Sequence, residues 1–173
     1  ISDLVTTFGK SYPRGPEFLE RLAKLGGSNA PPAELAALAS EALLANPLLD
    51  FDQLLLIRRN QGNLCLPQNW QGNCALPRGA VGNEIAILSP VRPDGKLTTL
   101  HTPAGNRFVG DIDLHFDADR LLFSMPGEHN RFQVWEIRTD GTGLRQITKT
   151  EPDVDNYDAC YLPNGKIVYD STA

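Results

Sequence analysis

The chain has 173 residues, 41% of them hydrophobic, and its 16 basic and 21 acidic residues give a net charge of −5. This composition is ordinary for a globular protein, and the absence of a Lys/Arg cluster argues against a nucleic-acid or anionic-membrane partner. The longest apolar run, Leu54 to Ile57, is far shorter than the roughly 18 residues that cross a bilayer, so we expect no transmembrane segment.

Residues 1–47 predict an N-terminal α-helical hairpin. The first helix covers 16–25, where apolar residues recur at helical spacing after Pro16 and before Gly26. The second begins at Pro31-Pro32, carries a Leu/Ala stripe and ends before Pro47. We expect this hairpin to pack on the β portion of the protein; the alternative is an amphipathic helix that binds a partner.

The β portion, residues 48–173, begins with a strand over 53–57 that reads as buried on both faces. An insertion loop over 60–82 follows, and loops of more than about 12–15 residues are usually functional or disordered. Trp70, flanked by Asn69 and Gln71, is a candidate interface anchor in this loop. The alternative is that Trp70 tucks under its own loop and fills it.

Residues 110–148 read as four consecutive short strands separated by turn residues, the pattern of one propeller blade. The expected strands are Ile112–Phe116, Arg120–Met125, Phe132–Arg138 and Leu144–Thr148.

The blade pattern recurs along the chain at a period of 46 residues. Leu121-Leu122-Phe123 returns as Ile167-Val168-Tyr169, and 91–95 matches 137–141 at the same offset. Such periods indicate stacked repeats, because one small sheet cannot bury both of its faces alone. We therefore expect a mainly β fold, a partial β-propeller of about two and a half four-stranded blades.

The repeats VWEIRTDGTGLRQIT, LLFSM and IVYDS resemble those of TolB-type β-propellers. The runs NEIAILSPVRPDGKLTT and GDIDLHFDADRLLFSMPGE resemble more closely the propeller-bearing middle region of hydrazine synthase alpha-subunit-like proteins. This resemblance implies an exported bacterial protein, periplasmic or extracellular. In that family covalently attached haem, fixed by a C-x-x-C-H run, carries the chemistry; no such run occurs here.

Cys65 and Cys74 lie in the Gly-, Asn- and Pro-rich insertion loop, where a disulfide could form without breaking a strand. The alternative is two unpaired thiols, since the C-x8-C spacing is not that of a usual zinc knuckle.

Aspartates near the inner strands suggest a Ca²⁺ site, because carboxylates are the hard oxygen ligands that Ca²⁺ prefers. They are Asp111, Asp113, Asp153, Asp155 and Asp158. The run departs from a calcium-binding loop at Tyr157 and lacks its Glu. Recurrence at matching blade positions favours structural hydrogen bonds instead, so we expect no metal site.

The three histidines lie on separate segments, with His101 at a strand end, His115 on an inner strand and His129 in a turn. Their spacing encodes no local zinc site. Cys160 is expected at the place equivalent to His115 in the next blade, where the two could form a nucleophile and base pair if they faced each other.

The sequence contains none of the common nucleophile, phosphate-loop or metalloprotease motifs. We expect a non-catalytic scaffold that binds a protein or small-molecule ligand and holds no cofactor in this chain. The alternative is a pocket-forming segment of a haem-dependent redox enzyme related to the hydrazine synthase alpha subunit, with haem carried by the full-length protein. A closed propeller needs about 4–8 blades, so we expect either further blades or self-association through exposed blade faces.

Overall fold

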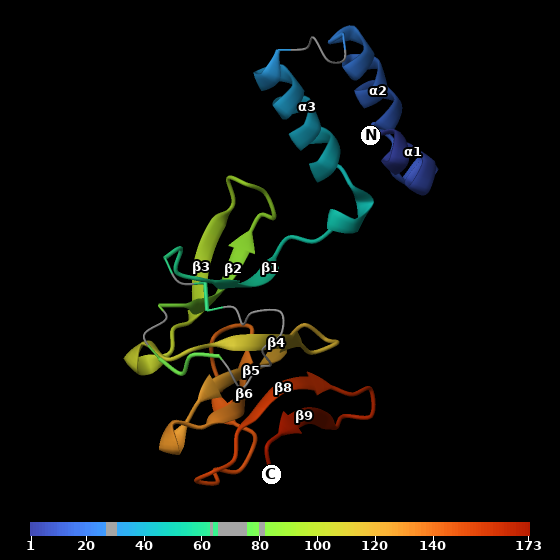
Figure 1. Cartoon of the computed structure of the whole chain (residues 1–173). Helices are drawn as coiled ribbons and strands as arrows, with labels where there is room; N and C mark the ends of the chain where they lie inside the picture. The colour runs from blue at the N-terminus through green and yellow to red at the C-terminus, as the bar shows by residue number, and fades with distance from the viewer. Residues whose placement is uncertain (27–30, 63, 66–75, 80–81) are drawn as a thin grey trace. The chain divides into compact units, whose positions relative to one another are not determined.

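The computed structural model describes residues 1–26, 31–62, 64–65, 76–79 and 82–173. These residues form N-terminal helices followed by antiparallel sheets of three, four and two strands (Figure 1). The chain divides into two compact units, one comprising Ile1–Leu54 and Ser89–Gly95, the other Leu55–Leu88 and Lys96–Ala173.

The helical unit contains α1 (Ser2–Phe8), α2 (Gly15–Lys24) and α3 (Pro32–Leu44). Both predicted helices are confirmed within a few residues, and α1 is an element that the sequence reading missed. Phe18 of α2 and Leu38 of α3 are buried in one core. The apolar stripes of these helices thus pack within their own unit.

The described residues of the sheet unit form three sheets. The first contains β1 (Leu54–Arg58), β2 (Glu84–Ser89) and β3 (Lys96–His101). The second contains β4 (Gly110–Leu114), β5 (Arg120–Pro126), β6 (Phe132–Arg138) and β7 (Arg145–Gln146). The third contains β8 (Asn156–Tyr161) and β9 (Ile167–Ser171).

The middle sheet is buried on both faces. Successive side chains of β5 point to opposite sides of the sheet, and another sheet packs on each side. Leu121 and Phe123 of β5 share a core cluster with Ile85 of the first sheet. Leu122, between them, lies in a second cluster with Ala159 of the third sheet. The predicted stacking of repeated sheets is therefore present among the described residues, which contain no closed propeller.

Two strand predictions need correction. The segment 53–57 was expected to be buried on both faces, but β1 is exposed at both ends and only half-buried between them, as one strand of a small sheet with a solvent side. The fourth strand of the predicted blade was expected over Leu144–Thr148 but is the two-residue β7. Next to β7, side chains make the hydrogen bonds: Gln146 donates to the Thr148 carbonyl, and the Thr148 hydroxyl donates to Gln133 of β6.

Candidate functional site

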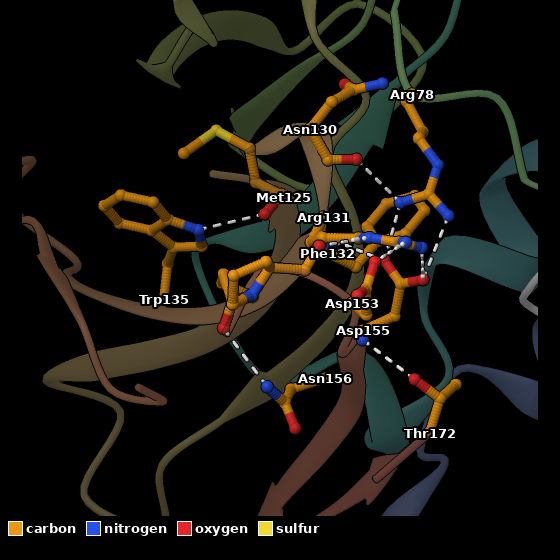
Figure 2. Close-up of polar contacts among 12 residues, drawn as sticks. Arg78, Met125, Asn130, Arg131, Phe132, Trp135, Asp153, Asp155, Asn156 and Thr172 are labelled. Carbon is orange, nitrogen blue, oxygen red and sulfur yellow. Dashed lines mark hydrogen bonds and ion pairs between the residues drawn. The ribbon is translucent and has the colours of Figure 1, made fainter. Parts of the chain in front are cut away.

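The most connected polar site of the sheet unit centres on Asp155, immediately before β8 (Figure 2). Its carboxylate accepts hydrogen bonds from Arg78 Nη1 at 2.6 Å and Nη2 at 3.0 Å. The backbone N–H of Phe132 donates to it at 2.7 Å, and Arg131 Nη1 donates at 3.3 Å. A carboxylate offers about four lone-pair sites, so these four donors saturate Asp155.

The backbone of Asp155 is anchored as firmly as its side chain. Its N–H donates to Thr172 Oγ1 at 2.9 Å, and its carbonyl accepts from the Thr172 N–H at 3.0 Å. The Asp155 side chain is only 9% exposed. Asp155 therefore ties the end of the third sheet to the turn between β5 and β6 and to the segment that carries Arg78.

The electrostatics of this cluster favour the ionised carboxylate. Hydrogen bonding from the Arg78 guanidinium, the largest cause, lowers the pKa of Asp155, and the Phe132 N–H adds to the effect while burial opposes it. The two guanidinium groups beside the carboxylate repel a further cation, and the four donors occupy its lone pairs. The arrangement can fasten sheets together but offers no free oxygen to a metal.

Arg78 is the member of the site that sequence reasoning missed. Its Nη1 also donates to the Asn130 carbonyl at 2.8 Å, and its guanidinium lies 5.1 Å from the centre of the Phe132 ring. Phe132 packs against Phe108 with ring centres 5.7 Å apart. The only sequence signal for Arg78 was its place in the insertion loop, and no local spacing indicated the partner Asp155.

A second cluster lies on the inner strands, where β4 and β8 each carry a bulge opposite β5 and β9. Asp111 and Asp158 occupy these bulges with left-handed φ angles of 51° and 54°. The Asp158 N–H donates to Ser124 Oγ at 3.0 Å, and the Ser124 hydroxyl also acts on the Asp111 carboxylate, whose pKa it lowers. Asn and Asp tolerate this conformation best among residues with a side chain, so the two repeated aspartates are explained by backbone geometry.

Asp111 differs from Asp155 because its environment favours the protonated form. Burial, the largest cause, raises the pKa of Asp111, and the Asp158 charge raises it further against the effects of Ser124 and Arg59. Its Oδ2 is buried without a hydrogen-bond partner among the described residues. The two aspartates that the sequence grouped together therefore lie in opposite electrostatic environments.

A third cluster of polar side chains lies between β6 and β8. Tyr161 donates its hydroxyl hydrogen to Glu136 Oε1 at 3.0 Å, and Arg145 contacts Glu136 Oε2 at 2.6 Å. The Tyr161 N–H donates to Asp113 Oδ2 at 2.8 Å. Asp113, predicted as a candidate ligand, thus accepts a backbone hydrogen bond between neighbouring sheets.

The histidines are placed differently from one another. His101 ends β3 as predicted, and burial against Phe123 lowers the pKa of its imidazole. His129 lies in the 3-10 turn Glu128–Asn130. His115, expected on the inner strand, lies just beyond β4, because the chain already turns there and the Asp117 N–H donates to its Nδ1 at 3.2 Å.

The predicted equivalence of His115 and Cys160 is also wrong. Cys160 lies opposite Val168, and Asp113 lies opposite Leu122 in the preceding sheet, so Cys160 corresponds to Asp113. The turn between β4 and β5 is one residue longer than the turn between β8 and β9, so the inner strands are offset by one residue more than the 46-residue period that relates β5 to β9. The spacing alone could not show this shift.

One group of potential metal ligands occurs among the described residues. Single atoms of His115, Asp117 and Asp119 lie within 4.8 Å of one another. Arg120 Nη1, however, contacts both carboxylate oxygens of Asp119, at 2.8 and 2.9 Å. The Asp119 carboxylate is thus already paired with a guanidinium group, and Asp117 at this turn is exposed.

The other predicted site residues fall at the insertion loop. Trp70, Asn69, Gln71 and Cys74 lie outside the described residues, so the interface anchor and the Cys65–Cys74 disulfide stay predictions. Cys65 is 7% exposed and packs with Leu76 and the Phe108–Phe132 pair.

Among the described residues, every helix is too short or too polar to cross a lipid bilayer. No family model and no curated protein matches this chain. Its fold is similar to part of the hydrazine synthase of Kuenenia stuttgartiensis, with a TM-score of 0.50 and 18% identity, covering 70% of this chain and 16% of that one. At this identity the likeness concerns the fold alone. The protein thus has a helical N-terminal unit and a β-rich unit that resembles part of hydrazine synthase.

Proposed function

We propose that this chain is a non-catalytic scaffold, an incomplete TolB-like propeller of an exported bacterial protein that binds a protein or small-molecule ligand. It acts outside the cytoplasm, in the periplasm or beyond the cell. Two findings support the proposal: the stacking of repeated sheets and the fold likeness to part of a much longer protein. The chain spans only 16% of that hydrazine synthase chain, so the activity of any whole protein is part of the proposal.

The observation that carries the proposal is the saturation of Asp155 by four N–H donors. A catalytic or metal-binding carboxylate needs an oxygen that faces substrate or ion. Asp155 instead connects segments that are far apart in the sequence. Two aspartates on the inner strands also connect neighbouring sheets. The Asp113 carboxylate accepts a hydrogen bond from the Tyr161 N–H, and the Asp158 N–H donates to Ser124.

The ligand surface that we propose is the insertion loop 60–82, with Trp70 as its aromatic anchor. Arg78, at the end of this loop, is fixed by Asp155 and Asn130. A loop attached at such a point can present its tip while its base stays in place.

The second candidate function is a pocket-forming segment of a haem-dependent redox enzyme, supported by the fold likeness to hydrazine synthase. The residues of this chain do not fit covalent haem. Cys65, Cys74 and Cys160 are too far apart for a C-x-x-C-H run, and Cys160 is followed by Tyr161. The histidine His101 is turned into the core against Phe123. Any haem would belong to another part of a longer protein.

The scaffold proposal is tested by thermal melting of the purified chain in millimolar Ca²⁺ and in EDTA. We expect the same Tm in both, because the Asp155 carboxylate has no oxygen free for the ion. Asp155→Asn should lower Tm equally in both buffers, and Arg131→Gln should do so more mildly. A Ca²⁺-dependent rise in Tm that Asp155→Asn abolishes would contradict the proposal. A saturable Soret shift on titration with haemin would favour the redox alternative.

A further inference from the structure

The guanidinium group of Arg59, the residue after β1, differs from that of its neighbour Arg58. Arg58 is 58% exposed, and its Nη2 lies 2.9 Å from Glu84 Oε1. Arg59 is half-buried, and its Nη1 is fully buried without a hydrogen-bond partner among the described residues. A buried cationic group without a hydrogen-bonded counter-charge is costly. Arg59 therefore calls for an acceptor that its neighbours in the structure do not supply.

Packing fixes Arg59 beside the first residues of β4. Its guanidinium carbon lies 5.4 Å from the centre of the Phe108 ring. Its Nη2 lies 3.7 Å from the point where a Cβ would stand at Gly110. Asp111 follows directly, and the charge of Arg59 acts on its carboxyl group. The guanidinium group is therefore close to Asp111, yet neither Arg59 Nη1 nor Asp111 Oδ2 has a partner within the described part of the chain.

Asp111 presents the second unpartnered atom of this place. Burial raises the pKa of its carboxyl group, and the charge of Asp158 raises it further against the effects of Ser124 and Arg59. A protonated carboxyl group donates one hydrogen bond through its O–H. The two residues together thus present a guanidinium N–H, a carboxyl O–H and one positive charge.

A small carboxylate matches these groups. One of its oxygens can accept from Arg59 and the other from Asp111, and its single negative charge balances the guanidinium charge. A phosphoryl group carries about 1.5–2 negative charges at pH 7, which is more than one guanidinium group balances, and Asp158 adds a negative charge nearby. Arg59 and Asp111 are both only half-buried, so a small anion can reach them from solvent.

We propose that Arg59 and Asp111 bind a small monocarboxylate anion between the end of β1 and the start of β4. Arg59 Nη1 donates to one ligand oxygen, and the Asp111 hydroxyl donates to the other. The competing explanation is an ordered water that bridges the two atoms. The inference rests on the proposed ligand-binding function and names a class of ligand for it.

The test titrates sodium formate into the full chain labelled with ¹⁵N, with sodium chloride at the same concentrations as the reference. We expect saturable chemical-shift changes at the Arg59 guanidinium group and at the amides of Gly110 and Asp111. Arg59→Gln should weaken formate binding about tenfold or more, because a charge-assisted hydrogen bond is lost. Arg58→Gln is the matched control, because it removes the same charge from a side chain that pairs with Glu84, and it should leave formate binding nearly unchanged.

The pH dependence of binding tests the role of Asp111 as a donor. Formate affinity should fall as pH rises through the Asp111 pKa, because the ionised carboxylate repels the anion. Asp111→Asn keeps a donor at every pH, so its formate affinity should be constant from about pH 5 to about pH 8. Asp158 is the other acidic group that acts on Asp111. The Cys65 thiol near Arg59 stays protonated in this range, because burial raises its pKa.

Four results would overturn the proposal. The absence of saturable shifts would assign the two atoms to a bridging water, and equal shifts with chloride would remove the preference for a carboxylate. Equal weakening by Arg58→Gln would indicate a general effect of charge, and the same pH dependence in Asp111→Asn would exclude Asp111 as the donor. The titrations of the natural chain and of Asp111→Asn decide the matter even if Arg59→Gln does not fold. The scaffold proposal is judged separately, by the Ca²⁺-independence of Tm.

Discussion

Phe123 of β5 and Tyr169 of β9 hold equivalent positions in neighbouring sheets, yet Phe123 is 0% exposed and Tyr169 is 42% exposed. The second sheet has a further sheet against each face and an outer strand along β5. Among the residues that the structure describes, the third sheet has such a neighbour on one face. The comparison shows that burial in a repeat comes from its neighbours more than from its own sequence, as expected for stacked repeats.

The largest expected effect tests this comparison at the equivalent aromatic positions. Phe123→Ala should lower the free energy of unfolding by about 4 kcal/mol, because it removes a fully buried ring and leaves a cavity. Tyr169→Ala should cost less than about 1 kcal/mol, because the ring is already half in water. Urea denaturation of both variants measures the difference, and equal costs would mean that the third sheet is covered as well as the second.

The next largest effect is expected at Asp155, whose hydrogen bonds connect the second and third sheets. Asp155→Asn should cost about 3 kcal/mol, because it leaves two partly buried guanidinium groups without their shared carboxylate. Its control is Asp153→Asn, which alters a carboxylate that is 92% exposed and that pairs, among the described residues, with Arg131 alone; it should change stability by less than about 0.5 kcal/mol.

The pH dependence of stability should reflect the ionisation of Asp155. The pKa of Asp155 is lowered in the folded protein, so its contribution is fully present above the unfolded-state carboxyl pKa of about 3.9 and is lost as pH falls through the folded value. The difference in Tm between the natural chain and Asp155→Asn should be constant from neutral pH down to about pH 5 and should shrink below about pH 4. A difference that grew in acid would contradict the assigned ion pairs.

The smallest effect, of opposite sign, is expected at Asp111. Its pKa is raised, so its contribution to stability is present below the unfolded-state value and is lost as pH rises through the folded value. Asn keeps the left-handed φ without the charge. Asp111→Asn should therefore raise Tm at neutral pH, with the gain disappearing in acid, whereas a lower Tm at neutral pH would indicate that the charge has a partner.

Much of this architecture is readable in the sequence, because local rules dictate it. The alternation and turn residues of 110–148 predict β5 and β6 almost to the residue, and the match of Leu121 to Ile167 gives the repeat. Prolines delimit α2 and α3. Helix α1 was missed, since seven residues show too few turns of apolar periodicity to be distinguished from a loop.

The contacts of Asp155 could not be predicted from the sequence, because its partners are distant along the chain. Arg78 and Asp155 are 77 residues apart, and only the fold brings them together. The turn between β4 and β5 is one residue longer than that between β8 and β9, so the counterpart of Cys160 is Asp113 and not His115. Of the aspartates that the sequence singled out as repeated, Asp111 and Asp158 hold matching positions, whereas Asp113 matches Cys160. The opposite pKa shifts of Asp111 and Asp155 depend on neighbours that no spacing reveals.

Amide hydrogen exchange of the 173-residue chain tests the central claim, that β9 repeats β5 and pairs, among the described residues, with β8 alone. In β5, both alternating sets of amides should be protected, so Leu122 and Phe123 should exchange slowly together. In β9, Val168 and Asp170 should be protected by β8, while Tyr169 and Ser171 should exchange nearly as fast as an unfolded peptide. Equal protection of Val168 and Tyr169 would contradict the account.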